Sequence, residues 1–194
     1  LGDYLDTLRR LWAPPPDDLI GLSLAEIARL AEKKKLPPVD EWNPARCGHS
    51  SMRIARDGAW YHEGRPIRRP AMVRLFSTIL RREPDGSYVL VTPAEKLDIE
   101  VEDAPFVAVE LKSEGAGKAR SLAFRLNTGD LVIAGSDHPL RFVGRPYVSV
   151  RAGLDALIAR PVYYELAGLA LAEGGLWSGG TFFPLGAERA LRSD

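Results

Sequence analysis

The chain has 194 residues, enough for one large domain or two small ones, and its 26 basic and 26 acidic residues give a formal net charge of zero. Without net charge, no overall field draws the protein to nucleic acid or anionic lipid, so we predict no nucleic-acid partner. The single cysteine excludes an intramolecular disulfide, and neither a signal peptide nor an apolar run near the roughly 20 residues of a membrane span is found. We therefore expect a cytoplasmic protein that does not insert into membranes.

The first 40 residues are predicted to form a helical segment. Leu5, Leu8 and Leu11 recur at helical spacing before the prolines at 14–16. Ser23 and Glu26 then have the spacing of a capping box, in which the hydroxyl and the carboxylate bind free amides at a helix start. A second helix is therefore expected from residue 24 to the prolines at 37 and 38.

From Ser51 onward the apolar residues alternate, as is typical of strands. Asp57-Gly58 predicts a two-residue hairpin turn of type I′, because both residue types tolerate positive φ angles. Pro70 predicts the start of a helix over residues 71–82. Three further strands are expected at 87–92, 97–103 and 106–112.

The same plan recurs later in the chain, with strands at 122–127 and 130–135 around a Thr128-Gly129 turn. A strand at 147–150 and a helix at 154–172 follow, and Pro161 is expected to start a new helix or to kink this one. The glycine-rich tail at 174–186 is expected to contain no regular element. These patterns predict an α+β fold with a helical segment (1–40) before two related subdomains (41–105 and 106–194), each an antiparallel sheet closed by a helix.

Five motifs follow one another between residues 42 and 106: WNPARCG, MRIARDGAWYHEGRPI, MVRLFSTILRRE, DGSYVLVTPAEK and VEDAPF. In this order they resemble a bacterial family catalogued as domain of unknown function 1285, over roughly residues 40–175. The resemblance implies a duplicated core of two α+β subdomains, the second similar in outline to pleckstrin-homology-like barrels. It also implies a ligand site between the two halves and a suspected nucleophile at the cysteine of the CG motif, here Cys47. It implies no particular activity.

The predicted hairpin register gathers reactive side chains near Cys47. If the chain stays extended without a bulge, one face of the sheet carries Cys47, His49, Ser51 and Arg53, joined by Trp60 and His62 from the partner strand. An imidazole and a nearby cation are what a nucleophilic cysteine requires. Cys47 and His49 are therefore the candidate catalytic residues, and the candidate ligand-binding residues here are Arg53, Trp60 and His62.

Two other roles for Cys47 remain open. A small buried hydrophobe is the usual role of a lone cysteine, and this interpretation is favoured. Cys47 and His49, with His62 or His138, could also supply three metal ligands, but the paired spacing typical of zinc sites is missing. We predict neither a metal site nor a cofactor.

Charge is also segregated along the first subdomain. Residues 65–82 contain six arginines and no acid, whereas residues 95–103 contain five acids and one lysine. The favoured interpretation is that these segments face water or pair with each other. The alternative is an arginine-lined pocket for a phosphate or carboxylate, in which Arg68 and Arg69 fit best because a helix begins at Pro70. Glu102 and Asp103 could then orient a cation or hold Arg53.

Three functional hypotheses follow. The leading one is a ligand-sensing or protein-interaction module, in signalling for instance, that binds a small molecule or peptide in a groove between the two subdomains. The second is a cysteine-dependent enzyme with Cys47 as nucleophile and His49 or His62 as base. The third is an interaction scaffold without a pocket, whose exposed apolar patch is built from Trp177, Phe182 and Phe183. Dinucleotide, phosphate-loop and serine-hydrolase motifs do not occur in the sequence.

Overall fold

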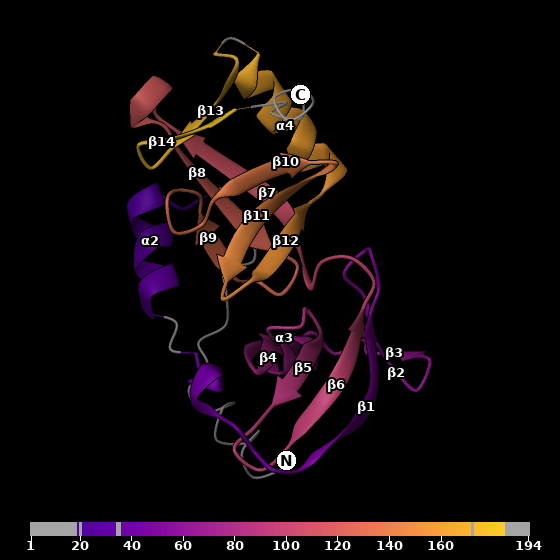
Figure 1. The fold of residues 1–194 in the computed structure, drawn as a ribbon. Coiled ribbons are helices and arrows are strands. Elements are labelled where there is room, and N and C mark those ends of the chain that lie inside the picture. The colour runs from indigo at the N-terminus through magenta and orange to yellow at the C-terminus, as the bar shows by residue number, and fades with distance from the viewer. Residues whose placement is uncertain (1–18, 20, 34–35, 172, 185–194) are drawn as a thin grey trace, which may run out of the picture. The chain divides into compact units, whose positions relative to one another are not determined.

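The computed structural model describes residues 19, 21–33, 36–171 and 173–184. Within these ranges the chain divides into two compact units: residues 36–105, and residues 19 and 21–33 together with 106–184. Each unit is built on a curled six-stranded sheet (Figure 1), so the predicted α+β fold with two related halves is confirmed. The helix predicted at residues 4–12 lies outside the described residues. No helix within the described ranges is long and apolar enough to cross a membrane.

The first unit combines one helix with six strands in the order β3-β2-β1-β6-β5-β4. The elements are η1 (Val39–Glu41), β1 (Cys47–Ile54), β2 (Trp60–His62), β3 (Arg65–Pro66), α3 (Pro70–Thr78), β4 (Leu80–Arg82), β5 (Tyr88–Val91) and β6 (Lys96–Val101).

The second unit has strand order β10-β11-β12-β7-β8-β9, followed by a helix and a separate hairpin. The elements are α2 (Leu24–Lys33), β7 (Phe106–Glu114), η2 (Gly117–Ala119), β8 (Ser121–Leu126), β9 (Leu131–Ile133), β10 (Leu140–Val143), β11 (Arg145–Arg151), β12 (Leu154–Ile158), α4 (Arg160–Ala170), β13 (Gly175–Ser178) and β14 (Thr181–Pro184).

The two sheets have the same connectivity. In each, two three-stranded antiparallel meanders are joined where the first strand pairs in parallel with the sixth, β1 with β6 and β7 with β12. The duplication is therefore confirmed, but the prediction of purely antiparallel sheets is wrong at this central pair. In chain order β7 corresponds to β1, so the hairpin of β8 and β9 corresponds to β2 and β3. The sequence pattern alone had suggested a match between that hairpin and the one around Asp57-Gly58, which joins β1 and β2.

The hairpin at Asp57-Gly58 differs from the prediction by one residue. Ala55 and Ala59 are the closing pair, with the Ala55 amide donating to the Ala59 carbonyl at 2.8 Å, so the loop has three residues and not two. Of the three loop residues, only Gly58 has a positive φ angle, of 82°. Asp57 instead accepts a hydrogen bond from the Ala59 amide on its Oδ1 at 3.0 Å, an arrangement that favours the right-handed conformation for the aspartate. The register therefore pairs Ile54 with Trp60.

Three other element predictions are corrected. The helix that Pro70 begins ends at Thr78, and residues 80–82 form strand β4. The segment predicted as helix from residue 154 starts as strand β12, and Pro161 lies in the first turn of the new helix α4. The glycine-rich tail forms the β13–β14 hairpin, in which the positive φ angles of Gly179 and Gly180 make the turn. In each case the extended segment is stabilised by pairing with another strand, and local pattern does not report such pairing.

The capping box at Ser23 is confirmed, and it begins a helix that covers the second sheet. Ser23 and Glu26 exchange hydrogen bonds, from the Ser23 amide to Glu26 Oε2 at 2.7 Å and from the Glu26 amide to Ser23 Oγ at 3.3 Å. The hydrogen bonds that the Ser23 amide and the Ser23 hydroxyl donate to the carboxylate hold the pKa of Glu26 below its ordinary value. Ile27 of α2 is fully buried against Leu19 and Ala123, and Leu131 and Ile133 pack against the same cluster, so the helix packs on strands β8 and β9.

Candidate functional site

The outer face of the first sheet carries the residues singled out around Cys47. Cys47 and His49 of β1 pair with Lys96 and Asp98 of β6, and Arg53 pairs with Glu100. Between His49 and Arg53 the strand has a bulge with two extra residues, where Ser51 has a φ of 53°. Side chains alternate between the two faces of a strand, so a bulge of two extra residues leaves the alternation unchanged. Cys47, His49 and Arg53 therefore lie on one face of the sheet, which we call the outer face.

Trp60 and His62 do not belong to this face, so their predicted place beside Arg53 is wrong. The three-residue hairpin loop shifts the register by one, and Tyr61 is the residue that pairs with Arg53. Trp60 is 2% exposed and stacks on Phe76 of α3, with ring centroids 6.4 Å apart. Its indole is therefore part of the core of the first unit. His62 pairs with Met52 and is exposed.

Cys47 is exposed, so the interpretation as a buried hydrophobe is wrong. It is the first residue of β1, at the end of the sheet. Within the described ranges its sulfur takes part in no hydrogen bond. His49 is two residues further along the strand, a spacing of about 7 Å between equivalent positions.

His49 is held by a carboxylate. Its Nδ1 lies 2.6 Å from Oδ2 of Asp98, across the parallel pair of strands, and the imidazole is 85% exposed. A carboxylate on Nδ1 fixes the orientation of the ring and leaves Nε2 directed elsewhere, which is the arrangement of a general base with its orienting group. Sequence spacing could not reveal this partner, because Asp98 is 49 residues away.

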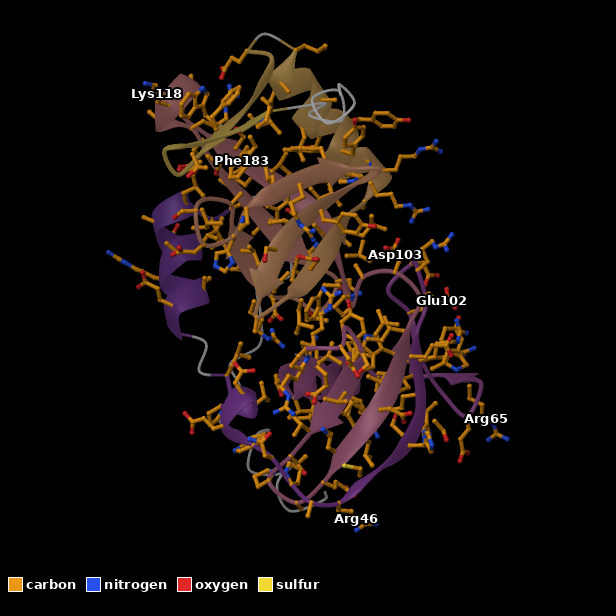
Figure 2. All side chains as sticks on the ribbon, in the orientation of Figure 1. Arg46, Arg65, Glu102, Asp103, Lys118 and Phe183 are labelled. Carbon is orange, nitrogen blue, oxygen red and sulfur yellow. The ribbon has the colours of Figure 1, made fainter. Side chains whose placement is uncertain are left out.

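Arg53 is engaged on two sides. Its guanidinium pairs with the carboxylate of Glu102 and lies over the ring of Tyr61, 4.5 Å from the centroid. Glu102 also accepts a hydrogen bond from the Arg56 amide at 3.0 Å. Of the two roles predicted for Glu102, holding Arg53 is thus the one that the geometry supports. Glu102 and Asp103 follow β6 near its end in Figure 2.

Arg81 is a structural residue. Its side chain is buried, and Nη1 donates to the carbonyl oxygens of Val39 and Trp42, both at 2.7 Å. Its Nε donates to Glu83 at 2.7 Å, and Lys96 donates to the other oxygen of Glu83 at 3.1 Å. Burial raises the pKa of Glu83, but the hydrogen bonds from Arg81 and Lys96 outweigh this effect and hold the pKa below its ordinary value.

Arg65, Arg68 and Arg69 form no ion pair with the acids at 95–103 in the part of the chain that the structure describes. Glu95 binds Arg46, Asp98 binds His49 and Glu102 binds Arg53. These three basic partners lie in β1 or directly before it. Arg65, Arg68 and Arg69 are exposed, and the structure gives them no ion pair among the residues that it describes. Figure 2 shows the Arg65 side chain at the β2–β3 hairpin, extending away from the ribbon. Of the two outcomes in the favoured interpretation, these three residues follow the first, because they face water and do not pair with the acidic segment.

The start of α3 lies next to two of these arginines. Arg69 is the N-cap residue and Pro70 the first residue of the helix, as predicted. No side chain caps this end, and no acid lies in its first turn. The positive end of the helix dipole is therefore not compensated within the helix.

Other candidates do not form a cluster. Nowhere in the described part of the chain do three His, Cys, Asp or Glu side chains come close enough to hold a metal ion.

The predicted apolar patch is only partly exposed. Phe183 is buried, whereas Phe182 is 40% exposed and lies against Trp177 with ring centroids 5.1 Å apart. Lys118 lies over the Trp177 ring at 5.4 Å, beside this hairpin in Figure 2.

Comparison with known proteins identifies relatives of this chain but no activity. A search among curated proteins finds no match. A crystal structure of a DUF1285 family protein from Silicibacter pomeroyi DSS-3 is 49% identical, with a TM-score of 0.73, and the match covers 84% of this chain and 94% of that one. A DUF1285 family protein from Shewanella baltica OS155 is 27% identical with a TM-score of 0.49, over 60% of this chain and 90% of that one.

Two family models match consecutive parts of the chain. Residues 37–104 match the N-terminal domain of DUF1285, and residues 105–185 match its C-terminal domain, both described as of unknown function. Together they span most of the sequence and meet where β6 gives way to β7. The chain therefore belongs to the DUF1285 family.

Proposed function

We propose that this protein is a binding module for an anionic ligand, a small molecule or peptide that bears a phosphate or carboxylate group, recognised by Arg65, Arg68 and Arg69. The single observation that carries the proposal is the exposure of these three arginines without an ion pair among the described residues. A guanidinium offers a planar fork of donors that matches both anions, and its charge does not titrate at ordinary pH.

The start of α3 adds to this attraction. Arg68 and Arg69 directly precede Pro70, and the helix end beside them has neither a capping side chain nor an acid. An anion held there would be stabilised by the helix dipole as well as by the guanidinium groups. The binding groove between the two halves and the role in signalling remain predictions.

Binding of inorganic pyrophosphate and of citrate, measured by isothermal titration calorimetry, tests the proposal. The double variant Arg68→Ala with Arg69→Ala is expected to weaken binding at least tenfold, because about 1.4 kcal/mol corresponds to a factor of ten and two charged contacts are lost. Arg160→Ala is the matched control, since Arg160 is also exposed and also lies at the start of a helix. Equal losses in both variants, or no binding of either anion, would contradict the proposal.

A cysteine-dependent enzyme is a second candidate, favoured by the carboxylate that orients His49 beside the exposed Cys47. The rate of Cys47 alkylation by iodoacetamide, followed against pH, tests it. An activated thiol should titrate well below the ordinary value of about 8.5, and His49→Ala should return it to that value. A wild-type profile already at or above that value speaks against this candidate.

A further inference from the structure

Helix α4 exposes large apolar side chains that no other described residue buries. The helix buries Val162, Leu166 and Ala170 against its own unit. Tyr164 is 62% exposed, and Leu171, which caps the helix in right-handed helical geometry, is 87% exposed. Residues four and three apart lie on one side of a helix, so Tyr164, Gly168 and Leu171 form a single stripe, which we call the α4 stripe.

Gly168, in the middle of this stripe, is not required to be glycine by any contact or backbone angle among the described residues. A Cβ atom added there would meet no heavy atom within 4 Å, and its φ angle is not in the left-handed region. Glycine inside a helix lowers helix stability relative to alanine. What glycine offers in return is a surface on which the backbone of another helix can come close.

We propose that α4 packs antiparallel against α4 of a second copy of this chain, with a two-fold axis passing beside Ala167 and Gly168. This places the two smallest side chains of the helix surface at the closest approach. Tyr164 and Leu171 are almost equally far from that axis along the helix, so Tyr164 of each copy meets Leu171 of the other. Such an isologous contact is self-complementary, as a two-fold dimer requires.

The charges of α4 favour the same partner. The helix has no acid in its first turn and no base in its last turn, and its first residue is the exposed Arg160. Both ends of its dipole are therefore uncompensated within the helix. In the antiparallel pair, Arg160 lies beside the negative end of the other helix, which has no base in its last turn. The chain as a whole has no net charge that would direct this face to an anionic lipid surface.

Sedimentation velocity of the full chain, over roughly 1 to 500 μM, tests the dimer in the concentration range typical of small, transient interfaces. We expect a reversible monomer–dimer equilibrium. Leu171→Glu should raise the dissociation constant at least tenfold, because it places two charges against tyrosine rings. Leu30→Glu, at an exposed leucine of α2, is the matched control and should leave the equilibrium unchanged. A chain that stays monomeric throughout, or a dimer that survives Leu171→Glu, would overturn the proposal.

Gly168→Ala provides a test that does not depend on loss of folding. The new methyl group enters open space in the monomer, so helix propensity should raise the melting temperature at low concentration by about 2 to 4 °C. The same methyl group should separate the paired helices and weaken dimerisation. Unchanged dimerisation would refute the close approach at Gly168. Co-sedimentation of a monomeric wild-type chain with phosphatidylglycerol vesicles, abolished by Leu171→Glu, would assign the stripe to lipid and overturn the dimer.

Discussion

Each unit has its own sheet, and the two sheets have the same connectivity. The units differ in where along the chain the helices are inserted. In the first unit α3 connects the third strand to the fourth, whereas in the second unit a short loop makes that connection and α4 follows the sixth strand. The second sheet receives α2, from earlier in the chain, on strands β8 and β9. The duplicated element is therefore the pair of three-stranded meanders. The helices are not part of the duplication, because they occupy different places in the two units.

The arginines of the two units differ in the same way. Three arginines of the second unit are each held by an acid: Arg120 by Glu173, Arg125 by Glu110 and Arg141 by Asp155. In the first unit the unpaired Arg68 and Arg69 lie in the connection that leads into α3. Arg125 and Arg141 in strands of the second sheet thus have acidic partners, whereas Arg65 of β3 and the two arginines of the connection have no ion pair among the described residues.

The largest expected effect separates the cores of the two units. Trp60→Ala removes a buried indole and should destabilise the first unit by about 3 to 5 kcal/mol, because a large cavity is left behind. Phe124→Ala, at a fully buried ring of β8, is the counterpart in the second unit. Hydrogen exchange resolved by peptide should show loss of protection in the altered unit first. Equal loss in both units would mean that they unfold as one cooperative structure.

Glu83 provides the next test, in the first unit only. Glu83→Gln leaves the buried Arg81 without its carboxylate and should cost about 1.5 to 3 kcal/mol at pH 7. Because the pKa of Glu83 is lowered in the folded state, its contribution is complete above the ordinary value of 4.5 and is lost as pH falls below it. Urea unfolding from pH 7 to pH 3 should therefore bring wild type and variant together in acid. A constant difference would contradict this sign.

The next test compares two three-residue hairpin loops at different places in the duplicated plan, the β1–β2 loop of the first unit and the β8–β9 loop of the second. Gly58 and Gly129 are the last loop residues of their hairpins, with φ angles of 82° and 86°. Replacing either glycine with alanine should cost about 1 to 2 kcal/mol, because a Cβ atom is unfavourable in the left-handed region. Gly135→Ala, at a position with open space and no positive φ, is the control for urea unfolding. A large difference between Gly58 and Gly129 would show that the turns are not equivalent.

The smallest expected effect concerns α2, which only the second unit has. Ser23→Ala removes the hydroxyl that accepts a hydrogen bond from the Glu26 amide, and it should lower the free energy of unfolding by about 1 kcal/mol. Hydrogen exchange in the first turn of the helix should become faster. Ser113→Ala, an exposed serine of β7, should have little effect on either measurement.

Local chemistry was predictable from the sequence. The capping box at Ser23, the helix start at Pro70, the hairpin around Asp57-Gly58 and the duplicated plan all follow from contacts within a few residues. The register of that hairpin was not predictable, because the same dipeptide fits a two-residue and a three-residue loop. Asp57 favours the longer loop through its bond to the Ala59 amide, and this choice moves Trp60 from the outer face into the core.

The sequence by itself determined the residue types of the candidate sites: a lone cysteine beside a histidine, and a run of arginines before a helix. Only the tertiary structure decided which of them have partners. His49 finds Asp98 and Arg53 finds Glu102, each 49 residues away, because β1 pairs in parallel with the last strand of its sheet. Asp98 and Glu102, which belong to the acidic segment that could have paired with Arg68 and Arg69, are thus bound to residues of β1. Both arginines are exposed.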